Sequence, residues 1–217
     1  MITAVSTTLN AEAPTSTLES SHPAASPPRG EQPAWIAAEL PPEYAEIARK
    51  IDDLRQEARK FERLADVLWC TGEPLKAAVR AVFEALDCTT VTPAAGSNFD
   101  LAVEVGPGQR LLAEVIAGPE PFDKRAPEVG RAFRAIQEDA GQGDRVILVA
   151  NIPCDKPAQT RHDTQATPDA LRLVQGLGAN IIATPTLFGL WRFSLKDKAG
   201  ARESLKRLHA LDGGIFR

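Results

Sequence analysis

The sequence predicts an α/β fold with a mixed β-sheet, preceded by one long, coiled-coil-like helix. Three observations predict this fold class. Segments with a helical apolar period alternate with short β-rich segments from residue 71 onward. The run "RVILVAN" is almost continuously apolar, as expected of a strand that a sheet buries on both faces. Ahead of these segments, apolar residues recur at steps of three and four over nearly four heptads.

Residues 1–40 are expected to form a disordered tail, because they are rich in Ser, Thr, Ala and Pro and lack an apolar period. The sequence shows no secretion-signal pattern and no run of eighteen apolar residues, so a membrane partner is not expected. The scattered Cys70, Cys88 and Cys154 predict neither a disulfide framework nor a zinc site. We therefore expect a cytoplasmic protein with reduced thiols.

Residues 41–71 are predicted to form the long helix. Prolines at 41 and 42 suit a helix start, and Thr71-Gly72 suits its end. About 28 residues would span roughly 42 Å, which is long for a helix that serves only its own small domain. The apolar seam consists of Tyr44, Ile47, Ile51, Leu54, Ala58, Phe61, Ala65 and Leu68.

Flanking charges favour one way of pairing two such helices. In a parallel dimer, Lys50 would face Arg55 of the second copy. Glu57 would likewise face Glu62, so both pairs would repel. An antiparallel register places Lys50 opposite Glu57 twice. We expect an antiparallel homodimer through the helix at 44–68, the alternative being that this helix folds back on its own domain.

Residues 72–217 are predicted to form the globular domain. Its elements, in chain order, are a helix at 71–87, strands at 88–93, 99–105 and 109–118, a helix at 127–140, a strand at 145–151, a helix at 168–178, a strand at 179–184 and terminal helices. Glycines at 106 and 108 mark the turn between the second and third strands.

Two acids stand out on this scaffold. Asp100 begins one hairpin strand and Glu114 lies inside the next, on the same strand face as Ile116. If the register brings the acids together, the pair could hold Mg²⁺ or Mn²⁺ beside a phosphate. The alternative is one acid at a strand edge and the other hydrogen-bonded to nearby backbone.

The segments "LADVLWCTGEPLKAAVRAVFEALDCTTVTP", "SNFDLAVEV", "RLLAEVIAG" and "RVILVAN" follow one another within residues 64–193. In this order they resemble the restriction-endonuclease-like, or PD-(D/E)xK, nuclease superfamily. The resemblance implies an αβββαβ core and metal-dependent phosphodiester cleavage. The family's Asp matches Asp100 and its Glu matches Glu114, whereas its Lys falls on Ile116.

This departure at Ile116 determines the functional expectation. The family's lysine is thought to position the nucleophilic water and to stabilise charge at phosphorus, which isoleucine cannot do. Loss of one such contact typically costs about 10² to 10³ in rate. An apolar neighbour also makes the two carboxylates harder to ionise, which weakens metal binding. We therefore expect a degenerate, non-catalytic site.

Other residues could complete the site. Lys124, in "PFDKRAPEVG", is a candidate substitute for the missing lysine if its loop turns back. Glu84 could contribute a helical acid, as in some related nucleases, or could face solvent beside Arg80. A basic patch could contact phosphates or could be a solvated helix face, and it comprises Arg192, Lys196, Lys198, Arg202, Lys206 and Arg207.

Three functions remain open at this stage. The leading one is a non-catalytic, nuclease-like protein that binds nucleic acid or a protein partner. The second is an active metal-dependent nuclease that uses Asp100 and Glu114 with a displaced lysine. The third is a structural dimerisation protein without a nucleic-acid role, which the nearly balanced 18 basic and 17 acidic side chains of residues 74–217 favour.

Overall fold

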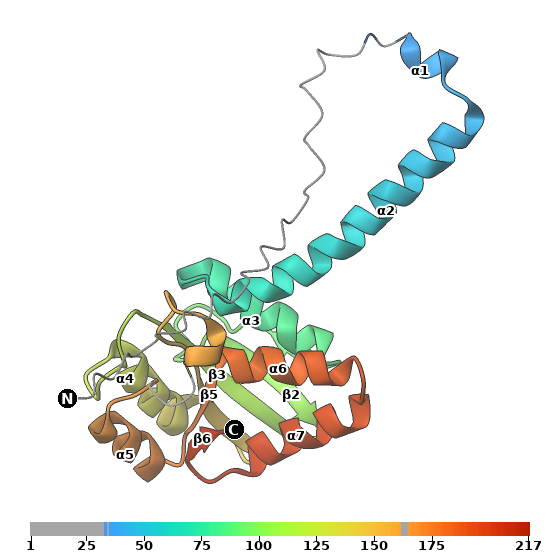
Figure 1. Cartoon of the computed structure of the whole chain (residues 1–217). Helices are drawn as coiled ribbons and strands as arrows, with labels where there is room; N and C mark the ends of the chain where they lie inside the picture. Colours follow the sequence, from blue (N-terminus) through green and yellow to red (C-terminus); the bar gives the residue numbers. More distant parts are fainter. Residues whose placement is uncertain (1–32, 34, 162–164) are drawn as a thin grey trace, which may run out of the picture. The chain divides into compact units, whose positions relative to one another are not determined.

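The computed structural model describes residues 33, 35–161 and 165–217 of the chain. Most of the predicted tail lies outside the described residues. The chain is an α/β protein with a long N-terminal helix and a six-stranded mixed sheet with interspersed helices (Figure 1). It divides into two compact units, Met1–Ala48 and Arg49–Arg217.

The N-terminal helical segment contains the predicted long helix but differs from the prediction at both ends. Within the segment predicted as a tail, Ile36–Glu39 forms the short helix α1. The long helix α2 spans Pro42–Ala65, so it begins at the second of the two prolines and ends before Thr71-Gly72, where the sequence pattern places its end. It continues directly into a 3₁₀ turn at Asp66–Leu68. No helix in the described part of the chain is long and apolar enough to cross a membrane.

The remaining elements occur in the predicted order, with one added strand at the C-terminal end. They are α3 (Gly72–Ala85), β1 (Thr89–Val91), β2 (Leu101–Gly106), β3 (Gln109–Ala117), α4 (Pro127–Arg134), β4 (Asp144–Asn151), α5 (Pro168–Gly176), β5 (Asn180–Ala183), α6 (Thr184–Ser194), α7 (Lys198–Ala210) and β6 (Gly214–Phe216). A π-helical turn at Ala135–Asp139 extends α4, and a 3₁₀ turn covers Ala158–Thr160.

The strands lie in the order in which the chain forms them, from β1 to β6. β1, β2 and β3 pair antiparallel, as the predicted meander requires. β3, β4, β5 and β6 pair parallel, through connections that each contain a helix or a longer loop. This arrangement confirms the mixed sheet, with β3 as the strand at which the pairing changes direction.

Helices cover both faces of the sheet and create two apolar cores (Figure 1). α3, α6 and α7 supply residues such as Phe83, Leu187 and Leu205 to the first core. α4 and α5 supply Val129 and Val174 to the second. β4 is buried from its third residue onward because both faces are covered, which explains its continuous apolar sequence.

Candidate functional site

Asp100 stands directly before β2, where it is fixed to β3 by its backbone and its side chain. Its N–H donates to the carbonyl of Ala113 at 2.8 Å. Its Oδ2 accepts a hydrogen bond from the N–H of Val115 at 3.0 Å. Glu114 lies between Ala113 and Val115, so these two bonds hold the Asp100 carboxylate next to it. The sequence alone leaves the register of the two strands open.

Strand alternation places Glu114 and Ile116 on the same face of β3. Val115 belongs to the first core, whereas Ile116 belongs to the second core, beneath α4. Ile116 is buried among apolar neighbours that include Phe122 and Val129. The position that the resemblance assigns to a lysine is therefore part of the hydrophobic core in this chain.

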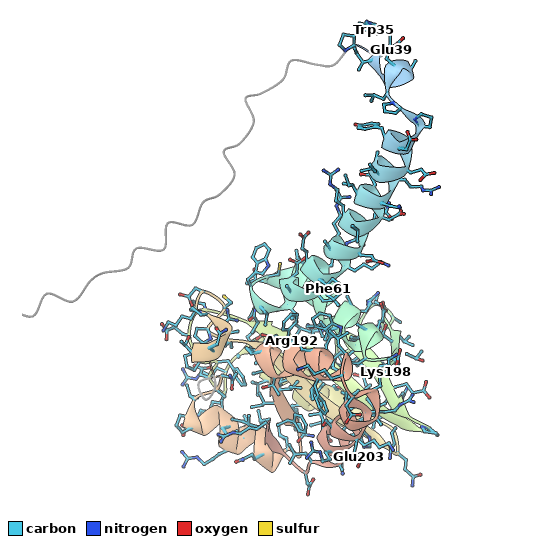
Figure 2. All side chains as sticks on the ribbon, turned by 45° about the vertical axis from the view of Figure 1, so that its right-hand side comes forward. Trp35, Glu39, Phe61, Arg192, Lys198 and Glu203 are labelled. Atoms are coloured by element: carbon cyan, nitrogen blue, oxygen red, sulfur yellow. The ribbon has the colours of Figure 1, made fainter. Side chains whose placement is uncertain are left out.

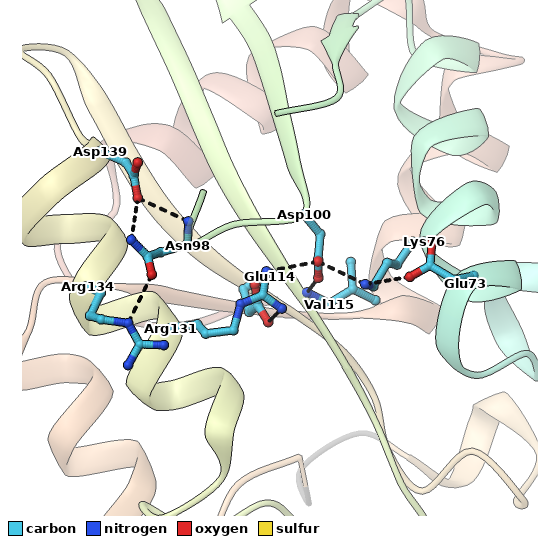
Figure 3. Close-up of polar contacts among 9 residues, drawn as sticks. All are labelled: Glu73, Lys76, Asn98, Asp100, Glu114, Val115, Arg131, Arg134 and Asp139. Carbon is cyan, nitrogen blue, oxygen red and sulfur yellow. Dashed lines mark hydrogen bonds and ion pairs between the residues drawn. The ribbon is translucent and has the colours of Figure 1, made fainter. Parts of the chain in front are cut away.

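Arg131 of α4 links the two acids (Figure 3). Its Nη1 lies 2.9 Å from Oε1 of Glu114, and its Nη2 lies 3.2 Å from Oδ1 of Asp100. The acid side chains are only 1% and 5% exposed, and that of Arg131 is 31% exposed. One guanidinium thus contacts both carboxylates and partly shields them from solvent.

Lys76 of α3 brings a second cation to the same carboxylate. Its Nζ lies 3.0 Å from Oδ1 of Asp100 and 2.8 Å from Oε1 of Glu73 (Figure 3). Hydrogen bonding to Glu73 first, and then to Asp100, raises the pKa of Lys76 despite the opposing effect of burial. Lys76 therefore stays charged, and the buried pair of acids faces a pair of cations from two helices.

Glu114 is the most perturbed acid of this cluster. Burial, followed by the negative charge of Asp100, raises its pKa to about 8, although Arg131 acts in the opposite direction. Among the described residues no donor has hydrogen-bonding geometry toward either Glu114 oxygen, so the Arg131 contact is close without being an aligned hydrogen bond. Glu114 therefore keeps its proton to a higher pH than an ordinary glutamate does.

Asn98 anchors the loop that leads into Asp100. Its side-chain and backbone N–H groups donate to Oδ2 of Asp139 at 3.0 and 3.2 Å. Its Oδ1 accepts from Nε of Arg134 at 2.9 Å (Figure 3). Because Asp139 ends the π-helical turn after α4, these bonds tie the Asp100 loop to the same helical segment that supplies Arg131.

The two further candidates that the sequence offered, Lys124 and Glu84, have partners outside the cluster. Nζ of Lys124 lies 3.8 Å from Oδ2 of Asp169, and both side chains are exposed. Glu84 accepts a hydrogen bond from the hydroxyl of Thr90 at 2.7 Å, in an exposed position. Two helical acids approach the cluster: Glu73 pairs with Lys76, and the charge of Glu128 of α4 acts on Glu114. The cations that contact the two acids come from α3 and α4.

The cluster does not fit a Mg²⁺ or Mn²⁺ ion, which prefers several oxygen ligands in near-octahedral geometry. Oδ1 of Asp100 already faces two cations, and its Oδ2 accepts the Val115 N–H. Arg131 faces Glu114. In the described part of the chain, no group of three or more His, Cys, Asp or Glu side chains has a metal-holding arrangement. A metal would therefore have to displace Arg131.

A groove of about 350 Å³ opens beside the cluster. Lys76, Arg80, Thr92 and Asp100 are among its lining residues. The guanidinium of Arg80 donates to the hydroxyl of Thr92, which connects α3 to the loop after β1. This groove exposes one side of Lys76 to solvent, so α3 is the side from which a ligand could approach the cluster.

The basic patch lies on α6, the following turn and α7, where acids accompany several of its cations (Figure 2). Lys198 lies 3.2 Å from Asp87, and Lys206 lies 3.6 Å from Glu203. Arg202 and Lys206 border a groove of about 490 Å³ that is also lined by Asp87 and Glu104. The surface that results carries charges of both signs.

Comparison of the chain with models of protein families, with curated proteins and with solved structures found no match.

Sequence reasoning missed Lys76 and Arg131. Lys76 follows Glu73 by three residues and looks like an ordinary surface pair along a helix. Arg131 lies in "PEVGRAFR", two residues after Val129, where a sequence pattern gives no reason to single it out. Both cations reach Asp100 only because α3 and α4 flank the same end of β2.

Proposed function

We propose that this chain is a non-catalytic, nuclease-like protein that acts by binding. One observation carries the proposal. Arg131 contacts both carboxylates that would otherwise hold a metal, and the place of the family's lysine belongs to the apolar core through Ile116. The resemblance of residues 64–193 to restriction-endonuclease-like proteins remains part of this proposal.

A protein partner is favoured over nucleic acid. Phosphate recognition needs cations that are free to displace counterions. In the basic patch, Lys198 and Lys206 are paired with acids, and Asp87 and Glu104 lie in the adjoining groove. This mixture of charges supports recognition of a polar protein surface better than recognition of a uniformly negative backbone.

An active nuclease with a displaced lysine is the second candidate. The ammonium of Lys76, 3.0 Å from Asp100, favours it, because a cation beside the acids is what that chemistry needs. Unlike Lys124, which the sequence suggested, Lys76 comes from the helix ahead of the sheet.

A cleavage assay separates these two candidates. The full chain is incubated with Mg²⁺ or Mn²⁺ and with single- and double-stranded DNA and RNA, alongside Glu114→Ala and Glu84→Ala. We expect the full chain to cleave no more than Glu114→Ala and Glu84→Ala do. Cleavage at the same rate in all three preparations would come from a contaminant. Cleavage that Glu114→Ala abolishes and Glu84→Ala retains would establish an active nuclease and refute the proposal.

A binding assay tests the preference for protein. Fluorescence anisotropy of labelled oligonucleotides is measured at low and physiological salt for the full chain and for Arg192→Ala. We expect no binding that falls steeply with salt. Binding that is lost with salt and weakened by Arg192→Ala would assign the protein to nucleic acid instead.

A further inference from the structure

One face of α2 exposes a row of large apolar side chains. These side chains are between 42% and 63% exposed, whereas side chains of their size are usually buried. They come from Tyr44, Ile47, Ile51, Leu54 and Phe61. Their spacing of three and four residues places them on one stripe of the helix. Contiguous apolar surface of this kind marks an interaction site.

The exposed stripe ends where the core of the domain begins. Leu64 and Val67 are buried and belong to the first core, and Leu68 packs against it. The α-helix itself gives way to a 3₁₀ turn at Asp66. Phe61, labelled in Figure 2, is the last exposed member. Its ring lies 5.8 Å from that of Trp191. The seam predicted over residues 44–68 is therefore available only from Tyr44 to Phe61.

These limits determine which register would cover the whole seam. Its midpoint lies between residues 52 and 53. If two copies pair antiparallel about that point, Ile51 lies opposite Leu54, and Tyr44 lies opposite Phe61. Ile47 lies opposite Ala58, so that a large side chain meets a small one. Each exposed apolar residue then has an apolar neighbour from the second copy.

The charges of α2 complement this register. Residues 43–53 hold four acids and two cations, whereas residues 54–63 hold four cations and two acids. Antiparallel pairing brings each half against the half of opposite charge. It also places Lys50 beside Glu57 twice, once on each side of the midpoint of the seam. Parallel pairing would set halves of like charge side by side.

We propose that the Tyr44–Phe61 face of α2 binds a second copy of this chain as an antiparallel helical pair. This inference goes beyond the proposed function, because it rests on α2 alone and holds whether or not the domain cleaves nucleic acid. The partner is another copy, since α2 itself offers the matching apolar stripe and the opposite charge distribution.

The oligomeric state of the full chain tests the proposal. Sedimentation equilibrium should give a reversible dimer of twice 23.3 kDa. Ile51→Glu should raise the dimer dissociation constant at least about tenfold, because it places a charge in the centre of the seam. Gln56→Glu, which adds the same charge away from the seam, should leave the constant nearly unchanged. A monomer at all concentrations, or equal behaviour of the two variants, would overturn the proposal.

Charge exchange tests the antiparallel direction. Lys50→Glu should weaken the dimer about threefold, because it turns two attractive pairs into repulsive ones. Glu57→Lys should do the same, and the double exchange should restore the original affinity. In a parallel dimer, either single exchange would strengthen association by removing a repulsion with Arg55 or Glu62. Tighter association of the single variants would therefore overturn the proposed direction.

Discussion

The Nη1 atom of Arg131 lies 2.9 Å from Oε1 of Glu114, a side chain that is only 1% exposed. The same guanidinium reaches Asp100, so a single residue of α4 connects the helix to the two acids at the sheet. An exposed ion pair contributes little to the free energy of unfolding. Loss of one partner from a buried pair is destabilising, because the charge that remains is poorly solvated.

Arg131→Ala should lower the free energy of unfolding by about 1–3 kcal/mol, because Asp100 would keep only Lys76 as a cationic partner. Urea unfolding at neutral pH measures the change. Lys124→Ala is the matched control, since its pair with Asp169 is long and exposed and should contribute little to stability. Equal losses in the two variants would contradict a structural role for Arg131 in the cluster.

Glu114 should make stability fall as the pH rises. Burial and Asp100 raise its pKa from 4.5 to about 8, so the folded state holds this proton more tightly than the unfolded chain. The contribution of Glu114 is most favourable below pH 4.5 and is lost progressively between about pH 4.5 and 8. Ionising Glu114 in the folded state costs about 3–5 kcal/mol more than ionising it in the unfolded chain.

Glu114→Gln should remove this dependence. The amide cannot ionise, so the variant should unfold at a higher urea concentration than the parent at pH 8 and show a smaller difference at pH 5. Urea midpoints at several pH values provide the measurement. Glu203→Gln, on an exposed pair with Lys206, is the control. Parallel pH profiles for the parent and Glu114→Gln would rule out a perturbed carboxyl.

Ile116→Lys should destabilise the domain rather than restore a nuclease. The new ammonium would enter the apolar second core, at a cost of about 3 kcal/mol or more. Ile116→Val, which only removes a methylene, should cost about 1 kcal/mol. Thermal unfolding distinguishes them. A Lys variant as stable as the Val variant would mean that the core position accepts a charge.

Asp144 should be a source of acid sensitivity. Burial by itself would raise its pKa, but the Arg110 guanidinium and the Gly141 N–H outweigh this and hold it below 3.8. Its stabilising effect is therefore present above pH 3.8 and is lost as the pH falls through the lower folded value. Asp144→Ala should cost about 1–2 kcal/mol at neutral pH.

The geometry of the Arg110–Asp144 pair explains why the Asp144 carboxylate stabilises the fold. Nε and Nη2 of Arg110 donate to the two carboxylate oxygens at 2.9 and 2.6 Å, across the first parallel register pair of β3 and β4. Asp169→Ala, on an exposed pair with Arg172, is the control and should change acid unfolding less. The opposite ranking would show that pairing at the start of β3 does not matter for stability.

The regular elements could be predicted because their signals are local. The alternation along "RLLAEVIAG" places Glu114 and Ile116 on one face whatever surrounds the strand. The continuous apolar run of β4 and the apolar stripe on α2 are local signals as well, and both can be recognised from the residue order alone. β6 was missed because a strand of three residues that begins at the second of two glycines carries too little periodicity to be recognised.

The sequence by itself indicated the order of the elements along the chain from α2 to α7, the shared face of Glu114 and Ile116, and the repeating stripe on α2, because these depend on local periodicity. Only the tertiary structure decided which cations meet the acids. Arg131 and Lys76 come from two helices, and their distances to Asp100 depend on how α3 and α4 pack beside β2 and β3. The tertiary structure also decided where the exposed stripe on α2 ends, because Leu64 is buried by residues far along the chain.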